Sequence, residues 1–294
     1  MIYRNLEEML GKKEDRYFGD RFRLVGLKII ERHIKSIPFC FKYCLMYPKN
    51  WSKHNGIIKT PPHLSTLDAT VLSIKSIEIY LNNINIDVSN CFIEKLSIKS
   101  GNRLVENISN LEAEFDYDVE DNTKFVFKGN IENFRVKLVI REQPKIRDDF
   151  NGLSYYEEQF KKFPNELTHI SIAKKYIEGS YKFDNSKLCI AGLDSSLIRS
   201  NGTMPVTDFI IYVAQLTEGY FQFINDSPRD DSNSLIMRNL KICRTNGLEC
   251  KKNILHIENK KTKIIGVQGD KYMVSRLEGK TLDTFISYSV TQLL

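Results

Sequence analysis

Chemically useful side chains gather at the predicted start of a helix at Pro62–Leu81. His63 lies on the segment that enters this helix, and Asp68 lies in its first turn. A histidine and a carboxylate at one helix end can act as base and acid at a carbon α to a carbonyl. Two structural explanations stay open, because a first-turn Asp also complements the helix dipole and a loop His often bonds to backbone.

A weaker copy of this helix follows at Met204–Phe221, where Asp208 corresponds to Asp68 at an offset of 208 − 68 = 140. The same offset aligns Glu78 with Glu218. Three matches at one offset, with Tyr80 and Tyr220 as the third, predict two copies of one unit. The position of His63 is occupied by Thr203 in the second copy, which fits one working site and one supporting half, and also fits relaxed drift.

Four further polar residues lie along the two predicted helices and are candidate substrate-binding groups. Lys75 and Gln215 come seven residues after the aspartates, about 20° from their helix face. Glu78 and Glu218 come ten residues after them, about 80° away. Contacts to a neighbouring sheet and paired structural carboxylates are the alternatives, since a carboxylate in an apolar helix needs a partner or a shifted pKa.

The elements around these residues predict an α+β fold. Ser65 and Asp68 fit a capping box at the start of the first helix. Apolar residues lie on several faces of this helix, which predicts that it is buried. Segments in which apolar and polar residues alternate, as in β-strands, follow both helices. Leu96 in the first set aligns with Leu240 in the second. A lone buried helix needs a sheet curled around it, so we predict a double hotdog: a repeat over 1–143, a linker over 144–165 and a repeat over 166–294.

Composition excludes several classes of protein. The net charge is +6, and the lysine pairs are scattered along the chain. A surface that binds nucleic acid would need clustered basic residues, so we predict none. The six cysteines form no CxxC, no His has zinc-ligand spacing, and no GxGxxG, P-loop or GxSxG occurs. The chain starts without an apolar leader and has no run of membrane-spanning length, so we predict a cytoplasmic protein with neither metal nor bound cofactor. A homodimer is compatible with the sequence.

Three segments together resemble the avirulence D protein family (AvrD) of plant-pathogenic and soil bacteria. They are RYFGDRF at 16–22, Tyr47-Pro48 followed by Trp51, and PHLSTLDA at 62–69. The resemblance implies synthesis of a syringolide-like acyl-sugar lactone, in which a β-ketoacyl group is joined from a thioester to a pentulose. Coenzyme A or an acyl carrier protein would carry the acyl group. The resemblance assigns no catalytic residue.

Two other functions remain open from the sequence. A hotdog protein can also be a dehydratase or a thioesterase that acts on acyl thioesters. Alternatively, the chain could bind acyl ligands or lactones without turnover, although it shows no DNA-binding segment of the kind a lactone sensor carries. For an enzyme we expect His63, Asp68 and Asp208 to be the catalytic residues and Lys75, Gln215, Glu78 and Glu218 to bind the substrate.

Overall fold

The computed structural model describes residues 1–52, 58, 60–144, 153–163, 166–182, 190–226, 234–245, 254–267 and 269–294. The α-helices are α1 (Glu7–Leu10), α2 (Thr66–Asn83), α3 (Ser195–Asn201) and α4 (Val206–Asn225), and short 3₁₀ turns are η1 (Lys13–Asp15), η2 (Arg21–Leu24), η3 (Val88–Asn90) and η4 (Gln159–Lys161). The strands are β1 (Ile2–Asn5), β2 (Gly26–His33), β3 (Phe39–Met46), β4 (Cys91–Lys99), β5 (Leu111–Asp121), β6 (Lys124–Ile131), β7 (Phe134–Glu142), β8 (Leu153–Ser154), β9 (Leu167–Ile172), β10 (Tyr176–Tyr181), β11 (Ile190–Ala191), β12 (Ile236–Arg244), β13 (Ile254–Val267), β14 (Asp270–Lys280) and β15 (Thr284–Leu293).

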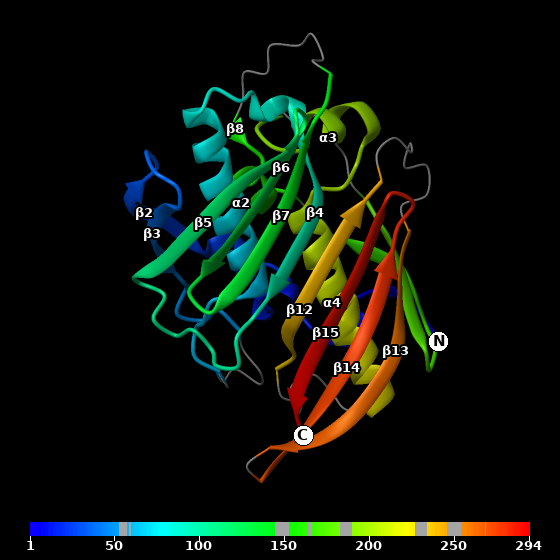
Figure 1. Ribbon diagram of the computed structural model, residues 1–294. Helices are drawn as coiled ribbons and strands as arrows, with labels where there is room; N and C mark the ends of the chain where they lie inside the picture. Colours follow the sequence, from blue (N-terminus) through cyan, green and yellow to red (C-terminus); the bar gives the residue numbers. More distant parts are fainter. Residues whose placement is uncertain are drawn as a thin grey trace.

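A single curved sheet runs through both halves of the molecule (Figure 1). Among the described residues, 13 antiparallel strands join in the order β1-β9-β10-β13-β14-β15-β12-β4-β7-β6-β5-β3-β2. The halves meet where β4 pairs with β12, and Ser97 lies opposite Lys241. These two residues are 241 − 97 = 144 apart, which is the offset of Leu96 and Leu240, so each strand meets its own equivalent across the junction.

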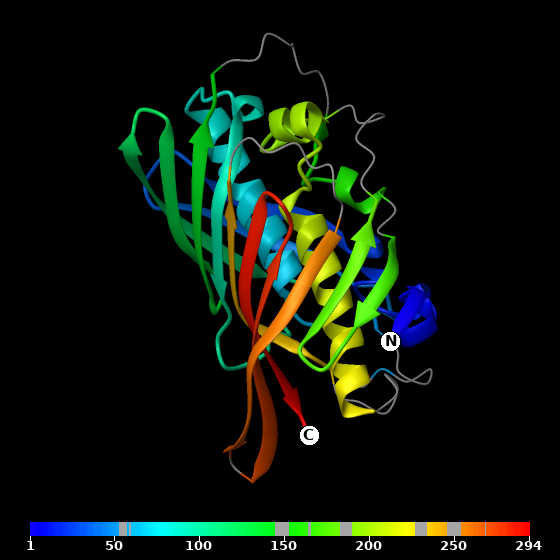
Figure 2. The same ribbon diagram turned by 90° about the vertical axis from the view of Figure 1, so that its right-hand side faces the viewer.

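The long helices α2 and α4 contact each other inside the curve of this sheet (Figure 2). Each half therefore has one long helix and an antiparallel sheet wrapped around it. This confirms the predicted double hotdog. None of the helices in the described part of the chain combines the length and the apolar character needed to cross a bilayer.

Helix α2 begins as its sequence predicts. The Ser65 hydroxyl accepts from the Asp68 backbone N–H at 3.1 Å, and the Asp68 carboxylate accepts from the Ser65 N–H at 3.2 Å, which completes the capping box. Apolar residues are buried around the helix, and the buried hydroxyls of Thr70, Ser73 and Ser76 donate to carbonyls four residues earlier. These bonds let polar residues lie in an otherwise dry helix.

Helix α4 includes Phe209–Val213, which has strand-like residue types. The uninterrupted apolar run through this segment correctly predicts a helix, since it is longer than a strand of this sheet requires. Pro205 precedes the first turn, and Asp226 ends the helix in a left-handed conformation with φ of 47°.

Two segments differ from what the sequence suggests. The Gly-, Ser- and Asn-rich composition of Asp194–Gly202 predicts a turn, and this prediction is wrong: Ser195–Asn201 form α3, whose first residues are fully buried. Residues 153–163, inside the predicted linker, pack the rings of Tyr155, Tyr156 and Phe160 into the core. In addition, β1 pairs with β9, so the first residues of the chain join the sheet of the second half.

Candidate functional site

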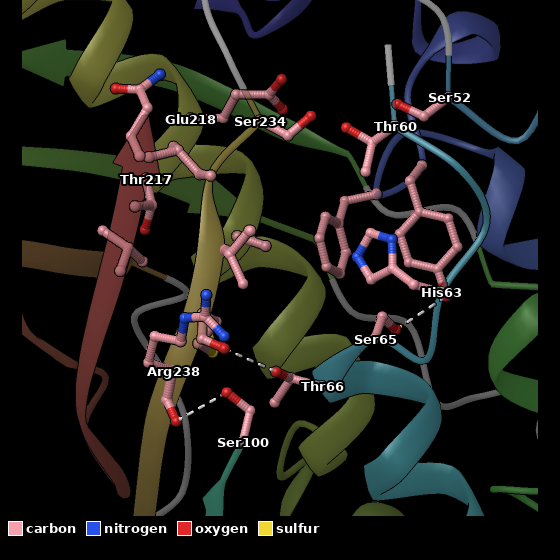
Figure 3. Close-up of a pocket in the computed structure, with 18 of the residues that line it drawn as sticks. Ser52, Thr60, His63, Ser65, Thr66, Ser100, Thr217, Glu218, Ser234 and Arg238 are labelled. Carbon is pink, nitrogen blue, oxygen red and sulfur yellow. Dashed lines mark hydrogen bonds between the residues drawn. The ribbon is translucent and has the colours of Figure 1, made fainter. Parts of the chain in front are cut away.

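A cavity of about 150 Å³ lies between the two repeats, where the start of α2 faces the middle and end of α4 (Figure 3). Its apolar walls come from both halves and include Phe18, Trp51, Phe134, Ile210, Phe221 and Val290. Its polar groups include His63, Thr66, Ser100, Glu218, Gln222 and Arg238. An apolar pocket with a few converging polar groups is the usual form of a small-molecule site.

His63 is held in place on the α2 side of this cavity. Its Nδ1 lies 3.0 Å from the Pro61 carbonyl oxygen, and its ring meets Trp51 edge-on at a centroid distance of 5.2 Å. Because a carbonyl only accepts, Nδ1 must donate in this contact. In the neutral ring, Nε2 then carries the lone pair, so this nitrogen can take a proton.

Asp68 organises the entry to α2 from behind the cavity wall and is not among the lining residues. Its Oδ2 accepts from the hydroxyls of Tyr17 (2.8 Å), Tyr47 and Ser65. Tyr47 also donates to the His63 carbonyl oxygen at 3.0 Å, so one hydroxyl links Asp68 to the backbone of His63. Burial and the charge of Asp68 raise the pKa of Tyr17 well above its usual value, so Tyr17 remains a donor.

Asp208 has a similar setting at the start of α4. Its Oδ2 accepts from the Tyr155 hydroxyl at 2.7 Å and from Thr207 Oγ1 at 3.2 Å. The other oxygen, Oδ1, is buried and has no partner among the described groups. Burial raises the pKa of Asp208 to about 7, because the charged form loses its hydration. Asp208 also lies outside the cavity lining.

The two Tyr–Asp pairs reveal a repeat signal that the sequence analysis missed. Tyr17 in RYFGDRF and Tyr155 in SYYEEQF are 155 − 17 = 138 apart, and the same offset aligns Phe22 with Phe160. The rings of Phe22 and Phe160 stack at 6.1 Å. Each repeat therefore uses a tyrosine from an aromatic segment to bond the aspartate that begins its long helix.

The candidate substrate-binding residues separate in space. Glu218 lines the cavity, facing the α2 side from α4 (Figure 3). Lys75 forms an ion pair with Glu157 at 2.8 Å, away from the cavity, and Gln215 is buried outside its lining. Glu78 accepts from Ser154 Oγ at 2.6 Å and from the Leu193 N–H at 2.8 Å, and burial raises its pKa to about 7. Of these residues and the predicted catalytic ones, His63 and Glu218 are thus the two that line the same cavity, and the roles of all of them stay predictions.

A buried ion pair between Asp194 and Arg244 was also missed. Arg244 Nη1 lies 2.6 Å from Asp194 Oδ2, and both side chains are almost completely buried. Asp194 also accepts from the Ile93 N–H at 2.8 Å and from the Tyr156 hydroxyl. Two charges 50 residues apart give no local pattern from which sequence could predict the pair. In the described part of the chain, no group of three or more His, Cys, Asp or Glu residues could hold a metal ion.

The fold is that of a double hotdog protein, and residues of both repeats line the cavity described above. Residues 1–141 match the family model of the Pseudomonas avirulence D protein (AvrD), which confirms the resemblance predicted from the motifs at 16–22, 47–51 and 62–69. No curated protein sequence matches the chain.

Solved structures with a similar outline include proteins from three bacteria. The tesB protein of Mycobacterium avium subspecies paratuberculosis has 7% identity and a TM-score of 0.45, with 90% of this chain and 95% of that chain covered. The acyl-CoA thioesterase II TesB2 of Mycobacterium marinum has 8% identity and a TM-score of 0.44, with 90% and 94% covered. An acyl-ACP thioesterase from Bacteroides thetaiotaomicron has 7% identity and a TM-score of 0.42, with 93% and 99% covered.

Proposed function

We propose that this protein is an enzyme that acts on acyl thioesters in the cavity between its repeats. The observation that supports this most directly is the meeting of His63, the start of α2 and Glu218 around one largely apolar space. The apolar walls suit an acyl chain, and the polar groups suit a thioester carbonyl and a hydroxylated acceptor. The more specific proposal is transfer of a β-ketoacyl group to a pentulose-type sugar, toward an acyl-sugar lactone.

In the proposed reaction, Nε2 of His63 takes the proton of a sugar hydroxyl. The hydroxyl oxygen attacks the thioester carbonyl carbon, the C–S bond breaks, and the imidazolium returns the proton to the leaving thiolate. The products are an ester and a free thiol. Negative charge on the carbonyl oxygen would be stabilised by the positive end of the α2 dipole, at the backbone of Thr66.

Two carboxylates have separate parts in this proposal. Glu218 lines the cavity and would accept hydrogen bonds from sugar hydroxyls. Asp68 is a positioning residue, because it acts through Tyr47 and Ser65 on the backbone that places His63. Asp208, Lys75, Gln215 and Glu78 lie outside the cavity lining and receive no step.

The experiment is incubation of purified protein with a β-ketoacyl thioester of coenzyme A or acyl carrier protein, with and without xylulose, followed by mass spectrometry. We expect acyl-sugar ester and free thiol in equal amounts. His63→Ala should lower the rate by about 10²-fold or more, the usual contribution of a general base. His33→Ala is the matched control, since His33 lies on β2, is exposed and bonds to Glu31.

Other outcomes would select a different function for the same cavity. Free acid formed without the sugar would indicate a thioesterase, and loss of water from a 3-hydroxyacyl thioester would indicate a dehydratase. Calorimetric binding with no product would indicate an acyl-ligand or lactone binder. Full activity of the His63→Ala protein would refute the proposed role of His63 whichever reaction occurs.

A further inference from the structure

Arg238 enters the cavity from an irregularity in β12. The pairing of β12 with β15 shifts register between Met237 and Asn239, so Arg238 is the residue at a β-bulge. A bulge turns a side chain out of the regular alternation of a strand and is often found beside active sites. In Figure 3 the Arg238 guanidinium points into the space between the repeats.

The first repeat has the same bulge with the opposite charge. The pairing of β4 with β7 shifts between Ile93 and Lys95, which places Glu94 at the bulge, 238 − 94 = 144 residues before Arg238. Glu94 is neutralised by Arg141 at 2.7 Å and by Lys95 at 3.3 Å. In the first repeat, the charge at this position is therefore balanced by basic residues of the same repeat.

Arg238 lacks such a partner. One guanidinium nitrogen, Nη1, donates to the Gly101 carbonyl oxygen at 2.9 Å, which fixes the orientation of the group. No carboxylate of the described residues forms an ion pair with Arg238. Burial lowers its pKa, so the surroundings alone do not favour the charge. A partly buried cation held toward a cavity without an anion is typical of a binding site for an anionic ligand group.

Other polar residues of the cavity lining also suit a group with several acceptor oxygens. The hydroxyls of Ser100 and Ser234 and the exposed Arg103 share the lining. We infer that Arg238 binds a phosphate ester on the substrate, with Arg103 at the rim of the same subsite. A guanidinium suits this role because its N–H donors match phosphate oxygens in pairs.

This inference rests on the proposed function, since it describes part of the substrate of that site. The phosphate has two chemical sources: a phosphorylated pentulose as the acceptor, or the carrier, where coenzyme A and phosphopantetheine both contain phosphate. Both sources require the same Arg238, so an experiment must vary the phosphate of each ligand separately.

The test is calorimetric binding of two matched ligand pairs, xylulose 5-phosphate against xylulose and 4′-phosphopantetheine against pantetheine. In the wild type, the phosphate of one pair should improve affinity about tenfold or more, the effect of a hydrogen bond to a charged group. The pair that responds identifies the source. Arg238→Met should abolish the preference, and Arg238→Lys should keep part of it.

Arg276→Gln is the control, because Arg276 lies on β14 with a 67% exposed side chain and is absent from the cavity lining. Melting temperatures of the variants check that they fold. The inference is overturned if the wild type prefers neither phosphate, or if Arg238→Met keeps the preference. Product formation without a phosphate preference would refute only this subsite, whereas a phosphate preference without any thioester reaction would refute only the proposed acyl chemistry.

Discussion

Replacing Asp208 with asparagine removes a carboxyl group that the fold buries completely, with no ion pair among the described residues. Its pKa is raised from 3.8 to about 7, mainly by burial. Between these pH values the folded protein holds a proton that the unfolded chain has released. Stability from this group is therefore complete below about pH 4, falls as pH rises, and is constant again above about pH 7.

The size of the effect follows from the two pKa values. One pKa unit corresponds to about 1.36 kcal/mol, so the rise from 3.8 to about 7 corresponds to about 4 kcal/mol over the whole window. About 2 kcal/mol of this falls between about pH 5 and pH 7. Asparagine resembles the protonated acid in shape and can still accept from the Tyr155 hydroxyl, but it does not ionise.

The assay is urea unfolding of the wild type and of Asp208→Asn at several pH values from about 5 to 8. The variant should gain about 3 kcal/mol relative to the wild type across this range. Comparing the two proteins cancels the titration of other groups. Asp118→Asn, a change at an exposed carboxylate on β5, should follow the wild type. If Asp208→Asn shows the wild-type pH slope, Asp208 is ionised in the folded state and the reasoning from burial is refuted.

Two further substitutions test the other buried charges by the same unfolding measurement. Glu78→Gln should remove a second loss of about 3 kcal/mol between about pH 4.5 and pH 7, because burial raises the pKa of Glu78 to about 7; an unchanged slope would contradict this. Arg244→Met should destabilise the protein by about 3–5 kcal/mol, since it leaves the buried Asp194 without its cation. Adding Asp194→Asn to that variant should recover part of the loss, and no recovery would show that the charge of Asp194 is not the cause.

The sequence predicts well those features of the fold that depend on residues close together in the chain. The capping box of Ser65 and Asp68 and the long helix after it are determined by residues close in the chain, and both are present. The offset of 144 between β4 and β12 also follows from matched strands. Such features depend on few distant contacts, so their patterns are visible without a structure.

The segments that sequence missed have misleading compositions. Glu157 and Glu158 give SYYEEQF the charged composition that is typical of a linker, yet its two tyrosines are completely buried. The serines of α3 are typical of a turn, yet Ser195 is buried with its hydroxyl on the Ser89 carbonyl. In both segments tertiary contacts outweigh local preference, and those contacts come from parts of the chain that no local pattern links.

The candidate site depends on such distant contacts even more. His63 was selected because it precedes a helix, and Glu218 because it matches Glu78, but nothing in the sequence places the two in one cavity. Arg238 gave no sequence signal, since a lone arginine in a strand is ordinary. Its place at the bulge and the absence of an anionic partner among the described residues distinguish it.

Equivalent side chains in the two repeats have different surroundings, and this difference affects where a ligand can bind. Glu218 lines the cavity, whereas its equivalent Glu78 accepts from the Leu193 N–H in the segment leading to α3. Ser100 also lines the cavity, whereas Arg244, 144 residues later, pairs with Asp194 at the start of α3. The equivalents of Glu218 and Ser100 thus bond to the segment around α3 and lie outside the cavity lining.

Random drift would remove useful residues from an idle half, but it would not supply matched internal partners for the groups that remain. The change from His63 to Thr203 is therefore better explained as part of the closure of one site than as an isolated loss. A closed half can still stabilise the open one, because β12 and α4 form a wall of its cavity. The second repeat thus contributes Glu218 and Arg238 to the cavity lining, so the proposed function depends on residues from both repeats.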